Sequence, residues 1–451
     1  MVREMNKRQK NAAVAWYQNH FIDWALFEYH VSTIREKLLS SHPGANKHQK
    51  KPKILNLCAD RYHFLVTFTA SILEGRTTVM PSNRSTGEIS RMSEMNNNIQ
   101  HICDADIVDL LKIETPENSN VTQWEINLIP DDMIVAELYT SGSTGTPTAN
   151  TKSWQQLVNG ARQIYTRFGL DHFSSTSIIA TVPPQHMFGF EMCIMMPLVC
   201  GVTIHHEQPF YPLDIQQSLN EMPPPRIMVT TPIHLKACNT LTEGWPPIEF
   251  IISATAPMPK DVASTAENIL KTEVREIYGC SEVGAIATRR STQNPSWELL
   301  PDYTLTEVNK ETLIAIPSSD KPIKLPDIIK SIDEQNFRLL GRNSDLIKIG
   351  GKRGSLADVT ARIKKIEGVE DAVVFMPDQA NKQRSRLAAL VVAPEMSAEQ
   401  IRQLLANEVD PAFLPRPLCV IAELPYNTTG KLVRDDLLNS LQHYIKESEA
   451  C

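Results

Sequence analysis

Hydroxyl groups and glycines are concentrated in one short segment, residues 138–147, which reads LYTSGSTGTP. The residues of this loop best suited to bind a ligand are Thr140, Ser141, Gly142, Ser143, Thr144 and Gly145. Glycines let the backbone approach a ligand closely, and backbone N–H groups together with hydroxyls can enclose an anion. A polyphosphate suits such a loop. The segment is not a Walker loop, because no Gly-Lys-Ser/Thr sequence ends it.

Glycine is scarce in the rest of the chain, and this supports a functional role for the two glycines of the loop. The chain of 451 residues holds only 18 Gly but 30 Pro, so the remaining glycines are expected where the backbone must meet a ligand or make a tight turn. A hydrophobic share of 42% and a net charge of −7 indicate a globular protein. The same charge argues against bulk binding to nucleic acid or to an anionic membrane.

Three absences narrow the class further. The eight cysteines show no Cys-x-x-Cys spacing typical of zinc sites, and the N-terminus lacks the apolar core of a signal peptide. The longest apolar run, residues 192–204, is too short to span a bilayer. We therefore expect a cytoplasmic protein with reduced thiols, no nucleic-acid partner and no membrane insertion.

The elements that must position the loop follow a β-α-β pattern. Residues 53–81 predict a strand, a helix and a second strand, and short buried strands are predicted at 177–183, 226–230 and 249–253. Residues 12–39 predict one or two amphipathic helices. The chain is thus expected to be α/β, a large N-terminal domain of layered sheets and helices.

Past residue 342 the predicted elements become smaller. Helical spacing at 356–366 and strands at 372–375, 387–392 and 418–422 predict a small α+β domain. Ser397 and Gln400 predict a capped helix start between the last two strands. The predicted division is therefore 1–341 and 342–451, with a joint at 342–345.

The loop at 138–147 resembles the phosphate-binding loop of adenylate-forming enzymes: acyl- and aryl-CoA synthetases, peptide-synthetase adenylation domains and luciferases. Residues 277–282, IYGCSE, resemble the family's Tyr-Gly-x-Thr-Glu motif. The resemblance implies that Glu282 helps to hold magnesium on the ATP phosphates, that Tyr278 lies near adenine or the acid, and that Ser281 keeps the hydroxyl of the family threonine. Thr255 replaces a glycine of the family's adenine-side turn.

Residues 184–189 resemble the family's His-x-x-Gly segment beside the acid pocket. By this resemblance His186 contacts or gates the substrate carboxylate, and Phe188, Gly189, Tyr278 and Gly284 line the pocket with it. No acidic residue falls in these segments, which disfavours amino-acid substrates.

The ribose and hinge motifs come next along the chain. Asp327 lies 14 positions before Gly341, as the ribose-binding Asp of the family does before its Gly-Arg motif. The resemblance implies that Asp327 and Arg342 contact ribose and phosphate, that Ser344 occupies the hinge position, and that Lys348 lies near the acid.

Residues 424–431, LPYNTTGK, resemble the motif that carries the family's catalytic lysine. Lys431 is therefore expected to bridge the substrate carboxylate and the α-phosphate of ATP. The resemblance implies ATP and magnesium as cofactors, an acyl-adenylate intermediate, and transfer to CoA or to the phosphopantetheine of an acyl carrier protein after the C-terminal domain rotates. The substrate would be a small-molecule carboxylic acid.

The short framework resembles compact ligases that load starters in arylpolyene-type pigment clusters, which favours an aryl acid such as a hydroxybenzoate over a fatty acid. Thr148 stands where the family loop usually has a lysine, and this departure motivates one alternative, a catalytically impaired nucleotide- or acyl-binding scaffold of the same fold. Retention of Glu282, Asp327, Arg342 and Lys431 opposes it. A generic P-loop NTPase is disfavoured by the missing Gly-Lys-Ser/Thr.

Overall fold

The chain divides into two compact units. A computed structural model describes residues 12–40, 51–96, 98–113, 125–140, 148–308, 311–317, 319, 321–342, 346–349, 352–377, 386–427 and 430–450. One unit comprises residues 1–304 and 314–323, and the other comprises 305–313 and 324–451. The domain boundary at 341/342 stays a prediction.

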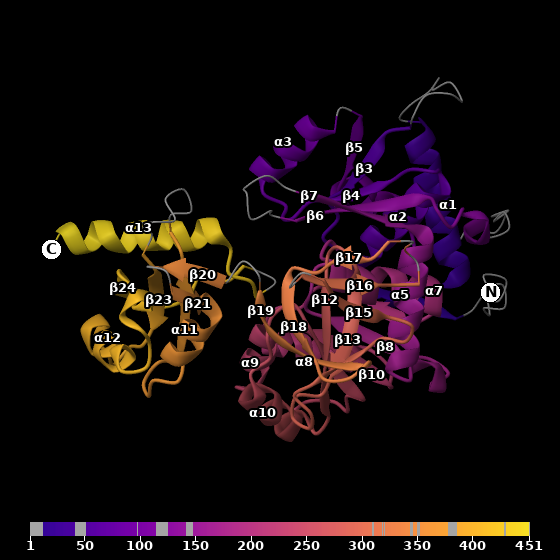
Figure 1. The fold of residues 1–451 in the computed structure, drawn as a ribbon. Coiled ribbons are helices and arrows are strands. Elements are labelled where there is room, and N and C mark those ends of the chain that lie inside the picture. The colour runs from indigo at the N-terminus through magenta and orange to yellow at the C-terminus, as the bar shows by residue number, and fades with distance from the viewer. Residues whose placement is uncertain are drawn as a thin grey trace. The chain divides into compact units, whose positions relative to one another are not determined.

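A long sheet runs through the first unit (Figure 1). Its strand order there is β14-β13-β12-β11-β10-β8-β9-β1-β2. Neighbours from β1 to β12 in this order are parallel, whereas β1–β2, β12–β13 and β13–β14 are antiparallel. The strands are β1 (Ala13–Tyr17), β2 (His20–Asp23), β8 (Ser177–Ala180), β9 (Thr203–His205), β10 (Arg226–Thr230), β11 (Phe250–Ser253), β12 (Glu273–Cys280), β13 (Gly284–Arg289) and β14 (Trp297–Leu299).

The first two strands correct one sequence-based expectation. Residues 12–39 form a β-hairpin followed by one helix, α1 (Trp24–Ser40), rather than helices throughout. Gln18 and Asn19 both adopt positive φ, 48° and 63°, which closes the two-residue turn between the strands. The apolar pattern alone did not reveal this turn.

A second sheet of the same unit has the order β5-β3-β4-β6-β7, parallel except for β6–β7. Its strands are β3 (Lys53–Asn56), β4 (Thr78–Met80), β5 (Ile99–Ile102), β6 (Ile134–Thr140) and β7 (Thr148–Ser153). The helix α2 (Arg61–Leu73) contacts β3 and β4 of this sheet and β9 of the long one. Every residue from Arg61 to Ile72 is buried, as expected for a helix enclosed on all sides.

The other helices of the first unit cover the sheets or join their strands. They are α3 (Thr86–Met95), α4 (Asp104–Ile107), α5 (Trp154–Arg167), α6 (Met187–Phe190), a π-helix (Glu191–Met195), α7 (Met196–Cys200), α8 (Pro212–Glu221), α9 (Pro232–Cys238) and α10 (Lys260–Leu270). Within the described ranges, no helix combines the length and hydrophobicity needed to cross a bilayer.

The second unit is a small α+β assembly. The boundaries between the units along the chain fall within β15 (Thr304–Val308), β16 (Glu311–Ala315) and β17 (Ile323–Lys324). The second unit contains β18 (Asp327–Ser331), β19 (Asn336–Arg342), β20 (Leu346–Ile349), β21 (Lys352–Ser355), α11 (Leu356–Ile363), β22 (Asp371–Phe375), β23 (Ala388–Val392), α12 (Ala398–Ala406), β24 (Leu418–Val420) and α13 (Arg434–Ala450). The capping box of Ser397 and Gln400 at the start of α12 is confirmed.

A buried histidine makes the stability of the first unit depend on pH. His234 in α9 is 4% exposed, and its Nδ1 lies 2.7 Å from the Thr231 hydroxyl. Desolvation lowers the pKa of His234 from 6.5 to about 4, so the folded state holds the neutral ring. The resulting stabilisation is present above the unfolded pKa and is lost as the pH falls toward the folded one.

We therefore expect His234→Asn to flatten the acid limb of stability. Between about pH 7 and about pH 5, the native chain should lose about 2 kcal/mol more unfolding free energy than the variant, because the unfolded chain takes up the proton first. Denaturant unfolding of both proteins at both pH values measures this. Equal losses of unfolding free energy in the two proteins would show that His234 is not the source of the pH dependence.

Candidate active site

The turn between β12 and β13 carries Glu282. Cys280 lies opposite Gly284 in this antiparallel pair, so Ser281, Glu282 and Val283 form the connection. The Glu282 side chain is exposed. Burial, together with the Glu282 carboxylate, raises the pKa of Cys280 to about 12, so a neutral thiol lies beside that carboxylate. Glu282 is thus presented at the end of a strand, where it can meet a ligand.

The strands on either side of the hydroxyl-rich loop are paired with each other. Thr140 ends β6, Thr148 begins β7, and the two residues lie opposite each other in the register. The two ends of the loop are therefore held together. Residues 141–147 and the Thr140 side chain lie outside the described residues, so the roles of Thr140, Ser141, Gly142, Ser143, Thr144 and Gly145 stay predictions.

Lys152 of β7 links this strand pair to the Glu282 turn. Its Nζ donates a hydrogen bond to the backbone oxygen of Glu282 at 2.5 Å. Lys152 is only 2% exposed, and desolvation lowers its pKa, while the Glu191 carboxylate acts in the opposite direction. A buried charge therefore joins the second sheet to the long sheet at the predicted phosphate site.

Glu191 holds the other end of the same turn. It begins the π-helix that continues α6, and one carboxylate oxygen accepts the backbone N–H of Ala285 at 3.2 Å. Burial raises the pKa of Glu191 to about 7, although the Ala285 N–H and the Lys152 ammonium both lower it. Gly284 makes room for this carboxylate: a Cβ there would lie 2.4 Å from its oxygen, and φ is +106°.

An acidic side chain therefore lies beside a residue expected to line the acid pocket, contrary to the expectation that none is near. Glu191 comes four positions after Met187, and the same Cβ position on Gly284 would lie 3.2 Å from the Met187 methyl. Helical spacing places these two side chains on one face, which the chain segments considered singly did not reveal. The available signal was a lone charge within the apolar run 187–199.

His186 stands at the start of α6. Its Nδ1 accepts the backbone N–H of Phe188 at 3.4 Å, so the neutral ring carries its proton on Nε2. Phe188 is buried. Gly189 packs against the carbonyl of Pro183, and a Cβ there would lie 2.1 Å from that oxygen. The His-x-x-Gly spacing thus has a steric reason in this fold.

The buried guanidinium of Arg61, in the first turn of α2, fixes the segment that leads to His186. It donates to the backbone oxygens of Ala180, Val182, His205 and Glu207. The bond to Val182 is 2.9 Å long. Gln185, the residue before His186, donates to the backbone oxygen of Cys58 at 2.8 Å. The approach to α2 and its first turn therefore hold the carboxyl ends of β8 and β9 together.

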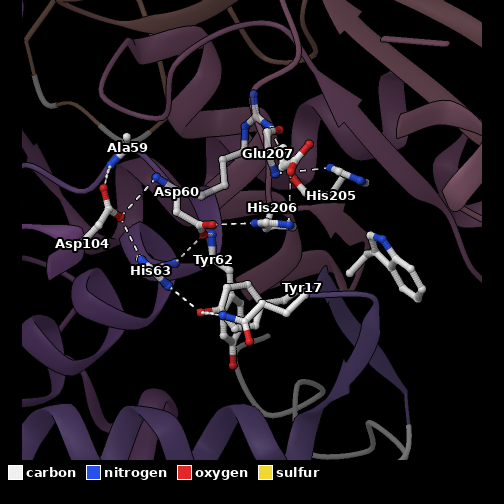
Figure 2. A network of polar contacts seen from close by, with 12 residues as sticks. Tyr17, Ala59, Asp60, Tyr62, His63, Asp104, His205, His206 and Glu207 are labelled. Carbon is white, nitrogen blue, oxygen red and sulfur yellow. Dashed lines mark hydrogen bonds and ion pairs between the residues drawn. The ribbon is translucent and has the colours of Figure 1, made fainter. Parts of the chain in front are cut away.

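Histidine–carboxylate contacts surround this turn (Figure 2). Asp60 accepts the backbone N–H of His63 at the start of α2 and lies 2.5 Å from the His206 Nδ1. Asp104 lies 2.8 Å from Nδ1 of His63, whose Nε2 is 2.8 Å from the Tyr17 hydroxyl. The network joins residues of β1 and α2 with the ends of β5 and β9, so the N-terminal hairpin is part of the framework behind the site.

The adenine-side candidates lie at one edge of the long sheet. β11 and β12 are parallel neighbours, so Thr255, just after β11, and the end of β12 face the same edge. Thr255 has a φ of +80°, a conformation that favours glycine, which is the residue the resembled family has there. The Tyr278 ring is largely buried, 5.7 Å from the ring of Trp297.

Five site candidates belong to the second unit. Asp327 and Arg342 lie opposite each other in the register of the antiparallel pair β18–β19, and their contact with ribose stays a prediction. Lys431 follows a tight turn in which its N–H donates to the Asn427 side chain at 2.9 Å. Lys348 lies in β20. The side chains of Arg342 and Lys348, and all of Ser344, lie outside the described residues.

The donor set fits a magnesium ion that arrives with ATP. Among the described residues, no group of three or more His, Cys, Asp or Glu side chains could hold a metal. Magnesium commonly uses one or two protein carboxylates together with substrate phosphates. The exposed Glu282 carboxylate would provide one such ligand.

The Arg61 contacts yield a stability prediction. Arg61→Lys should lower the unfolding free energy by about 3 kcal/mol, because one ammonium cannot serve four separated carbonyls and leaves buried acceptors unpaired. Denaturant unfolding measures the loss, with the exposed Arg84→Lys as the matched control. Equal stability of the two variants would contradict the positioning role.

Two sequence relatives are acid–thiol ligases by name. A 4-coumarate–CoA ligase of Halorhodospira halophila is 27% identical over 299 residues, 65% of this chain and 73% of that protein. A 3,4-dihydroxybenzoate–aryl-carrier protein ligase of Bacillus anthracis is 23% identical over 332 residues, 70% of this chain and 77% of that protein.

Solved structures share the fold. ATP-bound MatB from Rhodopseudomonas palustris has a TM-score of 0.81 at 14% identity, with 98% of each chain covered. The o-succinylbenzoate CoA synthetase MenE from Bacillus subtilis, in complex with its acyl-adenylate intermediate, has a TM-score of 0.78 at 18% identity, with 97% of each chain covered. The predicted fold class is confirmed.

The family comparison covers the central part of the site. The AMP-binding enzyme family matches residues 56–320, more than half of the chain. That range includes the hydroxyl-rich loop, the His186 segment and the Glu282 turn. The motif-based resemblance to adenylate-forming enzymes is thereby confirmed, and this chain belongs to the AMP-binding enzyme family.

Proposed function

We propose that this protein uses ATP to convert a carboxylic acid to an acyl-adenylate and then transfers the acyl group to a pantetheine thiol. The observation that carries the proposal is the link between Lys152 and the Glu282 carbonyl, 2.5 Å long. It holds the strand that leaves the phosphate-loop segment against the turn that presents the candidate metal ligand. The pairing of Asp327 with Arg342 supports a nucleotide contact from the second unit.

The chemistry requires neutralisation of charge. A carboxylate must attack the α-phosphorus of ATP, and both groups are anionic, so positioning and electrostatic stabilisation dominate catalysis. Glu282 would hold the magnesium, which screens the phosphates when bound. Lys431 would contact the carboxylate and the α-phosphate while charge develops between them, and the Nε2–H of His186 would orient the carboxylate.

The acid is proposed to be an aryl acid such as a hydroxybenzoate, ahead of a fatty acid. The two relatives named above are aryl-acid ligases, and this supports the choice. One of them transfers to a carrier protein and the other to CoA. Both thiols therefore remain candidate acceptors, and an acyl carrier protein is the candidate macromolecular partner.

The second candidate is a scaffold that binds nucleotide without chemistry, and Thr148 favours it. Lys152 is the nearest lysine to Thr148 along the chain. Lys152, however, is already engaged by the Glu282 carbonyl. The usual lysine of the loop is therefore not simply replaced by Lys152, and activity must be measured.

Acid-dependent exchange of labelled pyrophosphate into ATP separates the two candidates. With hydroxybenzoates, coumarates, benzoate and fatty acids as the panel, we expect exchange to be fastest with a hydroxylated aryl acid. ATP binding without exchange for any acid would favour the scaffold. Acyl transfer to CoA and to a phosphopantetheinylated carrier protein would then be compared.

The lysine at the C-terminal turn should be needed for the first half-reaction. Lys431→Ala is expected to slow adenylate formation at least about 100-fold, because a charge-stabilising donor is removed from the transition state. The matched control is Lys365→Ala, which removes an exposed lysine of the same unit. Exchange at the unmodified rate, with the melting temperature unchanged, would show that Lys431 is not catalytic.

A further inference from the structure

Two buried ionisable side chains, a lysine and a glutamate, contact the backbone of the Glu282 turn and of the residue that follows Gly284. We propose that Lys152 and Glu191 are positioning residues that fix Glu282 for its contact with magnesium-bound ATP. The proposal rests on the proposed function in one respect, the role of Glu282. Neither residue belongs to the recognised motifs, and each acts through the backbone of the turn.

Both contacts are made to backbone groups at or just after Glu282. Lys152 Nζ donates to the carbonyl of Glu282 itself at 2.5 Å, and Glu191 accepts the N–H of Ala285 at 3.2 Å. Two residues, Val283 and Gly284, separate these two backbone groups along the chain. A donor to the Glu282 carbonyl and an acceptor for the Ala285 N–H restrain both the position and the orientation of the backbone here, so the carboxylate of Glu282 is presented from a rigid turn.

The two side chains come from different layers. Lys152 lies in β7 of the second sheet, and Glu191 begins the π-helix that follows His186. Such π-helical turns occur often at functional sites. The turn is therefore held between the strand that leaves the phosphate-loop segment and the helix that begins at the acid-side histidine. This arrangement ties the nucleotide side of the site to the acid side.

Neutral hydrogen-bonding residues could make similar contacts, so the charges need a reason. Lys152 is 2% exposed and Glu191 is 4% exposed, and each acts electrostatically on the other. Among the described residues, no ion pair within 4.0 Å joins them. The electrostatic interaction between the two side chains offsets part of the cost of burying them, while each makes its hydrogen bond to the backbone.

Magnesium-dependent nucleotide binding should therefore fail before the fold does. The test compares the native protein, Lys152→Met, Glu191→Gln and the double variant that carries both changes. Removal of one buried charge leaves the other uncompensated and lowers stability, whereas removal of both restores the balance. We expect the melting temperature of the double variant to return close to that of the native protein.

Titration calorimetry in the absence of any carboxylic acid measures the dissociation constant for MgATP and thereby tests the positioning role. We expect the dissociation constant for MgATP to rise at least tenfold in the double variant, because the Glu282 carbonyl has lost its donor. Binding of ATP without magnesium should change less than threefold. Lys236→Met, an exposed lysine of α9, is the matched control and should leave both constants unchanged.

Hydrogen exchange tests the hydrogen bond between the Ala285 N–H and Glu191 in the absence of nucleotide. Glu191→Leu removes the acceptor of the Ala285 N–H, whereas Glu191→Gln retains an oxygen in its place. We expect exchange of the Ala285 amide to accelerate at least tenfold in the first variant and little in the second. Failure of the native protein to bind MgATP would overturn the proposed function. Hydrogen exchange would still show whether Glu191 restrains the backbone at Ala285.

Two results would overturn the positioning role. One is a double variant that regains both melting temperature and native MgATP affinity, because the pair would then serve stability only. The other is unchanged exchange of the Ala285 amide in Glu191→Leu.

Discussion

The arrangement of the first unit depends on the hydrogen bonds that the buried Arg61 guanidinium donates to the backbone. This guanidinium lies where α2 meets the carboxyl ends of β8 and β9, and it donates to four backbone oxygens from two separate connections. No acidic side chain could satisfy several carbonyls in this way, and a lysine has too compact a charge. The two sheets are therefore held together at the edge where the carboxyl ends of parallel strands present their loops.

Lys152 is a second buried cation, and it links the second sheet to the Glu282 turn of the long sheet. The proposed reaction brings an anionic acid and an anionic nucleotide together, so the framework of such a site must present positive charge and carboxylate ligands that do not pair with each other. Lys152 and Glu191 achieve this because each is bound to the backbone of the Glu282 turn rather than to the other. Glu282 thereby remains exposed for a ligand, while hydrogen bonds from Lys152 and to Glu191 hold the backbone of its turn.

Much of the fold and of the site could be predicted from local patterns. The β-α-β cadence, the small α+β unit and the capped start of α12 follow from apolar periodicity and from residues that cap helices. The glycines of the His186 and Glu282 segments also carry a readable signal, because Gly189 and Gly284 lie where a Cβ would clash. The N-terminal hairpin was missed, since its turn depends on the positive φ of Gln18 and Asn19, which a hydrophobic pattern does not encode.

The sequence by itself determined the family, the fold class and the order of the motifs, because these depend on residue types at short spacings. Tertiary structure alone decided the partners of Arg61, Lys152 and Glu191, each of which contacts backbone far away in the chain. A backbone carbonyl or N–H is the same group at every residue, so the sequence carries no mark of which one a buried charge will find. Only the packing of α2, β7 and the π-helix against the long sheet selects it.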